Sequence, residues 1–450
     1  MAGDHDVVIV GARCAGASLA VLLARAGLSV AVVDRAIFPS DTLSTHVFQN
    51  EGVAVLDRLG VLETVRSSGA PWLAEIDLRI DGLRVRRPLP VRAGDPGPWL
   101  CVRRPALDAA LVAAATAAGA DVRPGQAVTA LVQEDGSVAG VETPAGVLRA
   151  PLVVGADGRG SAVARLAGAR AYNLVPNQRL VCWGYFESAA AADPATVLLH
   201  RWDREAVLGC PTDAGLFMAA ILAPLERRQA YREDPDTAFA TDVARCEELA
   251  AALAGARRVG PLTRMMRWTG YLRESAGPGW VLVGDAGHFK DPTPGQGISD
   301  ALRQAERLAG EVVAGLDGSR DLDEAMAGWW RWRDGDAAEM AWFAGDLGRD
   351  GTVPPVLVEI LTSLAGKDDL DPFLEIFSHR VAPSEVLTPP RLLAATARLL
   401  ARGDHPRRQT LRQTRDIVTR DVRRQRLNRH PAYAGAGDHV GAPTDPDPEI

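Results

Sequence analysis

At 450 residues, of which 47% are hydrophobic, the chain is long enough to bury a large core and to form two or three domains. Its net charge of −7 does not favour nucleic acid as a partner, and the sequence indicates neither a membrane span nor a signal peptide. The five cysteines lack CxxC or histidine-paired spacing, which argues against a disulfide framework or a bound metal and favours free thiols in the cytoplasm.

The first segment has the pattern of a nucleotide-binding βαβ unit. An apolar strand over residues 6–10 is followed by GARCAG at 11–16, an alanine-rich helix over 17–26 and a second strand over 28–33 that ends at Asp34. The helix N-terminus would offer backbone N–H groups to a pyrophosphate, and Asp34 is placed to bind a ribose hydroxyl. Arg13 replaces the middle glycine of GxGxxG, which weakens the motif, although its charge could face the phosphates. A structural α/β turn is the alternative.

The next segments interrupt this parallel pattern. Residues 39–60 predict a polar loop followed by a helix, in which His46 could touch a ligand or could equally cap a helix or face solvent. Alternating apolar residues over 72–91, with Asp81-Gly82 as a turn, predict an antiparallel hairpin. Arg103 and Arg104 then stand where a helix begins, a position that suits either a phosphate or an exposed ion pair.

Two later strands also end in glycine-rich turns before helices. The first, at 152–155, leads into Asp157-Gly158 and a helix that Ser161 should cap. The second, at 280–283, ends in Gly284-Asp285 and continues through a Pro/Gly-rich loop at 292–297 into a helix from Ile298. Together with the first turn, this recurrence predicts one extended ligand along the carboxyl edge of a single sheet, because neither later turn is a GxGxxG fingerprint.

The remaining segments predict a β layer and a helical C-terminus. Strands are expected over 179–187, 196–202 and 215–223, with Trp183, Tyr185, Phe217 and Met218 divided by alternation between the two faces. A helix over 236–254 and a strand over 258–271 follow, then a long helical stretch over 302–349. Shorter helices over 352–364, 369–377 and 391–400 are separated by Pro383 and Pro389-Pro390, and 407–429 suits an amphipathic helix with a solvated face.

Four motifs of this sequence resemble those of FAD-dependent monooxygenases of the para-hydroxybenzoate hydroxylase fold. They are GARCAG with Asp34, Arg104-Pro-Ala-Leu-Asp-Ala-Ala-Leu, GADGRGS at 155–161 and GDAGHFKDPTPGQGISDA at 284–301. The resemblance covers about residues 5–345 and implies a mixed α/β fold, with a Rossmann-like FAD-binding domain, an interleaved antiparallel-sheet substrate domain and a C-terminal helical region. It implies FAD in an extended form, with the pyrophosphate at 11–16, the adenosine ribose at Asp34, the ribityl chain at Asp285 and the flavin beside 292–298. The FAD-binding positions so implied are Gly11, Arg13, Gly16, Asp34, Arg35, Arg104, Val128, Asp157, Gly158, Gly284, Asp285, Pro292, Gly295, Gln296, Gly297 and Ile298.

The same resemblance implies a discontinuous arrangement of domains. We expect the FAD-binding domain over 1–71, 99–178 and 262–345, and the substrate-binding β domain over 72–98 and 179–261. A C-terminal helical region should follow over 346–430, and the Pro/Gly/Asp-rich stretch 431–450 reads as a disordered tail.

Three functions compete at this point. The first is a monooxygenase that uses NAD(P)H as a transient co-substrate and O2 to hydroxylate or epoxidise an apolar or aromatic small molecule, through a flavin C4a-hydroperoxide. The others are a flavin-dependent reductase of the geranylgeranyl or prenyl type and a flavin-binding protein without turnover. A halogenase related to the tryptophan enzymes is disfavoured, because no lysine precedes Lys290 and a WxWxIP signature is absent.

The catalytic candidates are His288, Lys290 and His46. His288 and Lys290 lie in the loop beside the proposed flavin edge, where either could relay a proton or stabilise an anionic ring. For Lys290, a solvated loop lysine is the alternative.

Overall fold

The computed structural model describes residues 4–42, 44, 46–189 and 193–430. Its centre is a six-stranded sheet in the order β20-β21-β12-β1-β2-β8, in which only β20 is antiparallel to its neighbour. All residues of β1, β2 and β12 are buried, as expected of apolar strands covered on both faces. The strands are β1 (Val7–Val10), β2 (Val30–Asp34), β8 (Asp121–Pro124), β12 (Leu152–Gly155), β20 (Ala276–Gly277) and β21 (Trp280–Leu282).

Different layers cover the two faces of this sheet. Val7 and Ile9 join the core formed with helices α1 (Cys14–Arg25), α4 (Arg104–Ala117), α9 (Gly297–Leu316) and α10 (Leu322–Leu347). Val8 and Val10 point the other way and pack under a three-stranded antiparallel sheet of β9 (Ala130–Glu134), β10 (Ser137–Thr143) and β11 (Gly146–Arg149). The period of two along β1 therefore separates a helical layer from a β layer.

A second, seven-stranded sheet has the order β18-β14-β17-β16-β15-β5-β6 and is antiparallel except between β15 and β5. One face, which carries Trp183 and Met218, packs toward the C-terminal helices, and the other, which carries Phe217, packs under α7 (Pro235–Val243) and α8 (Glu247–Ala252). The strands are β5 (Glu75–Ile80), β6 (Leu83–Pro88), β14 (Arg179–Glu187), β15 (Thr196–Trp202), β16 (Glu205–Pro211), β17 (Phe217–Pro224) and β18 (Arg257–Met265).

Smaller elements join these layers. Two further three-stranded sheets are formed by β3 (Val47–Phe48), β7 (Trp99–Cys101) and β4 (Trp72–Leu73), and by β13 (Ala171–Pro176), β19 (Thr269–Arg273) and β22 (His288–Phe289). The shorter helices are α2 (Asn50–Arg58), α3 (Leu62–Arg66), α5 (Ala162–Leu166), α6 (Arg228–Glu233), α7 (Pro235–Val243) and α8 (Glu247–Ala252).

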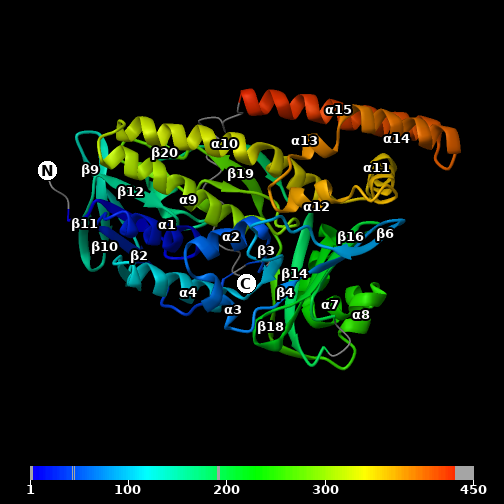
Figure 1. The fold of residues 1–450 in the computed structure, drawn as a ribbon, viewed down its shortest axis with the longest axis horizontal. Coiled ribbons are helices and arrows are strands. Elements are labelled where there is room, and N and C mark those ends of the chain that lie inside the picture. Colours follow the sequence, from blue (N-terminus) through cyan, green and yellow to red (C-terminus); the bar gives the residue numbers. More distant parts are fainter. Residues whose placement is uncertain (1–3, 43, 45, 190–192, 431–450) are drawn as a thin grey trace.

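The C-terminal helices lie along one long side of the molecule, with α14 and α15 outermost (Figure 1). They are α11 (Pro355–Ala365), α12 (Asp371–Phe377), α13 (Pro383–Val386), α14 (Pro389–Arg402) and α15 (Arg407–Arg429). Phe373 and Phe377 of α12 pack edge-on against Phe343 of α10, so this region shares a core with the rest of the chain. Within the described ranges, no helix combines the length and the apolar character that a membrane crossing requires.

The predicted mixed α/β class with C-terminal helices is confirmed, and so are the hairpin turn at Asp81 and the helix over 407–429. The single helix predicted over 236–254 is wrong, because the chain breaks between α7 and α8 and Cys246 precedes the second helix. The continuous helical stretch predicted over 302–349 is also wrong, because it consists of two helices. The second, α10, begins after Asp321, whose side chain caps it. The domain boundaries remain a prediction, and the expected tail lies outside the described residues.

Candidate functional site

Three glycine-rich turns meet at one edge of the six-stranded sheet. In the strand register, Val10 pairs with Gly155 and with Val33, and Gly155 pairs with Leu282. The chain therefore leaves β1 at Gly11, β2 at Asp34, β12 at Ala156 and β21 at Val283 along the same carboxyl edge. A Cβ on Gly11, whose φ is +104°, would lie 2.4 Å from the Ala156 carbonyl oxygen, so glycine is needed for two neighbouring turns to approach each other. Gly16 is equally constrained, because its Cβ would lie 1.8 Å from the Gly11 carbonyl oxygen.

Two helix N-termini at this edge present backbone donors. Helix α1 begins after Arg13 and α9 begins after Gln296, and neither residue caps its helix with its side chain. A Cβ added to Gly297 would meet nothing within 4 Å, so the start of α9 faces open space. Free N–H groups, a partial positive charge and room for close approach are what an extended anionic cofactor requires. The residues present therefore fit FAD.

Two acidic side chains stand beside these helix ends. Asp34 accepts hydrogen bonds from the backbone N–H of Ala12 at 2.7 Å and of Ala36 at 2.8 Å, which fixes its carboxylate at the end of β2. Burial raises the pKa of Asp285 to about 6, although Arg159 and Arg104 lower it. The Asp285 backbone carbonyl accepts a hydrogen bond from the Tyr271 hydroxyl at 2.7 Å. The protein's own hydrogen bonds thus hold the carboxylate of Asp34 and the backbone of Asp285.

The arginines predicted to face phosphates share one carboxylate that sequence reasoning missed. Asp108 accepts from Arg13 Nη1 at 2.7 Å and from Arg104 Nε and Nη2 at 3.1 and 2.9 Å. Arg13 also donates to Ser40, so its guanidinium lies over the loop after β2. The position of Asp108 four residues after Arg104 on a helix was the available signal. The exposed ion pair considered as an alternative for Arg103 and Arg104 is not formed, because Arg104 pairs with the fully buried Asp108 and Arg103 with the buried Asp213.

The structure also places the other predicted cofactor positions. The Asp157 carboxylate accepts from Ser161 Oγ at 2.5 Å and from the N–H of Ala162 at 2.6 Å, so it shapes the turn before α5. Ser161 caps that helix as predicted, and Gly158 has a φ of +75°. Arg35 is exposed beyond β2, whereas Val128 packs on the core beneath the β9–β11 sheet.

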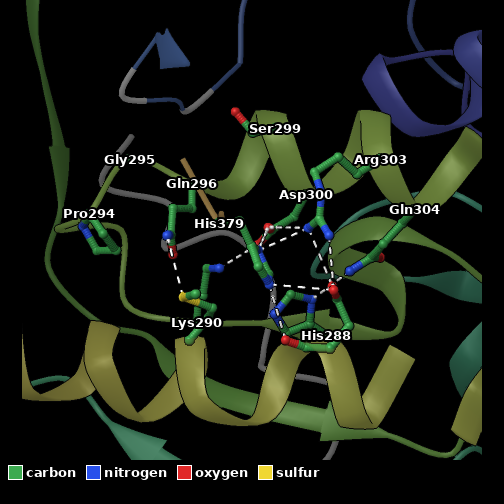
Figure 2. A network of polar contacts seen from close by, with 12 residues as sticks. His288, Lys290, Pro294, Gly295, Gln296, Ser299, Asp300, Arg303, Gln304 and His379 are labelled. Carbon is green, nitrogen blue, oxygen red and sulfur yellow. Dashed lines mark hydrogen bonds and ion pairs between the residues drawn. The ribbon is translucent and has the colours of Figure 1, made fainter. Parts of the chain in front are cut away.

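Lys290 and His288 are buried behind the start of α9 (Figure 2). Lys290 is only 6% exposed, so the alternative interpretation of it as a solvated loop lysine is wrong. Its Nζ lies 2.5 Å from Asp300 Oδ2. Burial alone would raise the pKa of Asp300, but Lys290 and His379 hold it well below its usual range. His288 Nδ1 lies 3.2 Å from Gln304 Nε2, and burial lowers its pKa to about 3.

The C-terminal helices reach the same loop, a contact for which the chain carries no local signal. His379, just after α12, places Nδ1 3.2 Å from Asp300 Oδ1, and its Nε2 lies 3.1 Å from the Asp336 carbonyl (Figure 2). Gln296 Nε2 donates to the carbonyls of Ile376 at 2.8 Å and Phe377 at 3.2 Å. The loop over 292–296 is therefore supported from behind by α12.

His46 joins the six-stranded-sheet region to the seven-stranded sheet. His46 is 1% exposed, so the prediction that it could face solvent is wrong. Its Nε2 contacts the Tyr185 hydroxyl, and the two rings stack with their centroids 5.5 Å apart. Burial lowers the pKa of His46 to about 3. The Arg103 guanidinium lies 5.7 Å from the Tyr185 ring centroid and is itself held by Asp213 at 2.9 Å.

Comparison with known proteins agrees with this geometry. The profile of the family described as "FAD binding domain" matches residues 4–324. A 6-methylpretetramide 4-monooxygenase of Streptomyces rimosus is 30% identical over 341 residues, which cover 72% of this chain and 78% of that protein. A menaquinone reductase of Mycolicibacterium smegmatis is 30% identical over 334 residues, which cover 68% of this chain and 76% of that protein.

Among solved structures, the flavin-dependent brominase Bmp2 superimposes with a TM-score of 0.71 at 19% identity, covering 89% of this chain and all of that one. At this identity the likeness shows the fold alone. The match of the family profile extends over more than half of the chain and spans all three turns at the sheet edge. The chain therefore belongs to the FAD binding domain family and is an FAD-dependent oxidoreductase.

Proposed function

We propose that this protein is an FAD-dependent monooxygenase that uses NAD(P)H and O2 to hydroxylate or epoxidise an apolar or aromatic small molecule. We further propose that it works in the cytoplasm. The observation that carries the proposal is the sheet edge with its uncapped helix starts, together with the similarity to a monooxygenase over 72% of the chain. Five buried free cysteines suit a reducing compartment.

The cofactor would be held by residues from all parts of the edge. The start of α1 at 11–16 would bind the pyrophosphate, Asp34 the adenosine ribose, Asp285 the ribityl chain, and the start of α9 the flavin. FAD, when bound, would accept a hydride from NAD(P)H and react with O2. The protein would orient the cofactor, exclude water and hold protons at defined atoms.

The substrate would lie against the face of the seven-stranded sheet that carries Trp183 and Met218. This face supplies aromatic and sulfur-containing side chains, which suit a flat apolar ligand. Tyr185 on the same strand contacts His46, which follows the loop after β2. Because burial keeps His46 uncharged, its ring would accept a hydrogen bond from the Tyr185 hydroxyl, which keeps its proton and leaves the phenol oxygen able to accept a hydrogen bond from a substrate hydroxyl.

A flavin-dependent reductase is the second candidate function. It is supported by the menaquinone reductase relative, whose identity to this chain equals that of the monooxygenase. Both reactions would use the same cofactor site and an apolar substrate face. They differ in whether the electrons from NAD(P)H go to O2 or to a carbon–carbon double bond of the substrate.

The deciding experiment measures the fate of oxygen. The purified protein, loaded with FAD, is given NADPH or NADH with 6-methylpretetramide or menaquinone, under 18O2 and under argon. The proposal predicts NAD(P)H oxidation matched by O2 uptake, and one 18O atom in the product. Equal turnover under argon, with saturation of the substrate, would establish the reductase instead. No oxidation with either substrate would contradict both assignments for these compounds.

A further inference from the structure

A cluster of polar side chains lies on the face of the seven-stranded sheet that packs under α7 and α8, on elements that carry none of the predicted FAD-binding residues. His200 is on β15, Asp77 and Arg79 are on β5, and Cys246 and Glu248 stand at the start of α8. His200 pairs with Arg79 in the parallel register of β15 and β5. This face also packs apolar residues against α7 and α8, and other buried charged groups on it, such as Glu205 with Arg245, have their own partners.

Three donor atoms of this cluster face one another. The distances are 3.4 Å from His200 Nδ1 to Cys246 Sγ, 3.5 Å from His200 Nδ1 to Glu248 Oε2, and 3.9 Å from Cys246 Sγ to Glu248 Oε2. In a tetrahedral zinc centre with Zn–S of about 2.3 Å and Zn–N and Zn–O of about 2.0–2.1 Å, donors are separated by roughly 3.3–3.6 Å. The observed triangle differs from this by a few tenths of an ångström.

The groups around the triangle leave the three donors available. His200 Nε2 lies 3.1 Å from Asp77 Oδ1, and with the proton on Nε2 facing this carboxylate the Nδ1 lone pair would point to the triangle. Arg79 donates to both oxygens of Asp77 and contacts Glu248 through Oε1 only. Glu248 Oε2 is therefore not bound by the arginine.

The charges also balance around a divalent cation. A Cys246 thiolate, Asp77 and Glu248 carry three negative charges, and Arg79 compensates one of them. The remaining two match a zinc ion. His200 is 2% exposed and Cys246 4%, whereas the Glu248 side chain is 28% exposed, so a route from solvent leads past the carboxylate.

We propose that His200, Cys246 and Glu248 bind one zinc ion, with Asp77 orienting the histidine and water as the fourth ligand. Binding replaces the thiol proton: the Cys246 S–H bond breaks, an S–Zn bond forms and the proton passes to solvent, with no change of oxidation state. The ion ties α8 to β15 and braces the sheet from the side opposite the proposed substrate face. This proposal departs from the sequence-based expectation of no metal, because only Cys246 and Glu248 are close in sequence.

The test compares metal binding among matched variants of the full-length, FAD-loaded protein. Cys246→Ser and His200→Asn remove donors, and Cys182→Ser is the control, because Cys182 is also buried on this sheet, within the core beneath α7. We expect one zinc per chain by elemental analysis in the wild type and the control, and binding weakened by more than about tenfold in the two site variants. With Co²⁺ alone, the wild type should show tetrahedral absorption bands in the red, where flavin does not absorb.

A second measurement needs no variant. Treating the wild type with a zinc chelator should lower its melting temperature, and Zn²⁺ alone should restore it, while the bound flavin stays constant. A wild type that is zinc-free, shows no cobalt bands and melts at the same temperature with and without chelator would overturn the proposal. A Cys246→Ser variant that binds zinc as tightly as the wild type would also overturn it. Cys246 would then not be a zinc ligand, and the contact between Cys246 and His200 would be only an S–H···N hydrogen bond.

Discussion

At the scale of single residues, burial decides the role of each candidate more than residue type does. The sequence indicated His288 and Lys290 as chemically able groups beside a flavin loop and His46 as a residue that could touch a ligand, and all three are buried. Their partners could not be predicted, because Tyr185, Gln304 and Asp300 come from other segments. Lys290 is directed at Asp300 behind the start of α9, which suits a positioning role for the loop better than contact with substrate.

The depressed pKa of His46 makes a prediction about pH and stability. Burial lowers its pKa to about 3, whereas an unfolded chain titrates near 6.5, so between these values only the unfolded state holds the proton. Stability from this group is present above about pH 6.5 and is lost as the pH falls. Asparagine tolerates the φ of +60° at this position, so His46→Asn should fold.

In His46→Asn, the fall in unfolding free energy between about pH 6 and pH 4 should become shallower, by up to about 1.4 kcal/mol per pH unit. Urea denaturation at a fixed FAD concentration, repeated at each pH, measures this unfolding free energy. His405→Asn, at a half-exposed histidine before α15, serves as the control and should follow the wild type. Parallel profiles for the wild type and His46→Asn would mean that His46 titrates normally in the folded protein.

At the scale of secondary-structure elements, local signals predicted the type of element better than its interruptions. The amphipathic pattern over 407–429 corresponds residue for residue to α15, and Ser161 caps α5 as predicted. Pro383 and Pro389-Pro390 were expected to separate helices. They also begin helices, since proline lacks only an N–H that the first turn leaves unbonded. The break between α7 and α8 has no comparable signal in the sequence.

The contact between α12 and the flavin loop makes a prediction at this scale. Because Gln296 and Asp300 bond to residues 376–379, ordering the loop with FAD should also stabilise the segment behind it. Hydrogen exchange of residues 371–380 should therefore slow several-fold when FAD binds the apoprotein. Helix α15, which lies on the outer side of α10, should exchange at the same rate in both forms. Unchanged exchange at 371–380 would show that the C-terminal helices are independent of cofactor binding.

At the scale of the whole molecule, the sequence predicted the sheet edge because of a general property of parallel strands. Strands that run the same way end at the same edge, so three strand–turn–helix repeats far apart in sequence could be expected to converge. The order β21-β12-β1-β2 confirms that expectation. The neighbour relations of the antiparallel strands, the docking of α12 and the His46–Tyr185 contact depend on long-range packing, for which a single sequence carries no local signal.

The central claim, that one FAD lies along this edge with its flavin at the start of α9, is tested most directly by a matched pair of glycine substitutions. Gly297 and Gly310 are both exposed glycines of α9, and a Cβ at either would meet nothing within 4 Å, so valine at either should fit without a clash and leave the fold intact. The Kd for FAD is measured by flavin fluorescence during titration of the apoprotein. It should rise at least about tenfold in Gly297→Val and stay unchanged in Gly310→Val, because only the valine at position 297 would enter the space of the cofactor. Equal FAD affinity in the two variants would contradict the account.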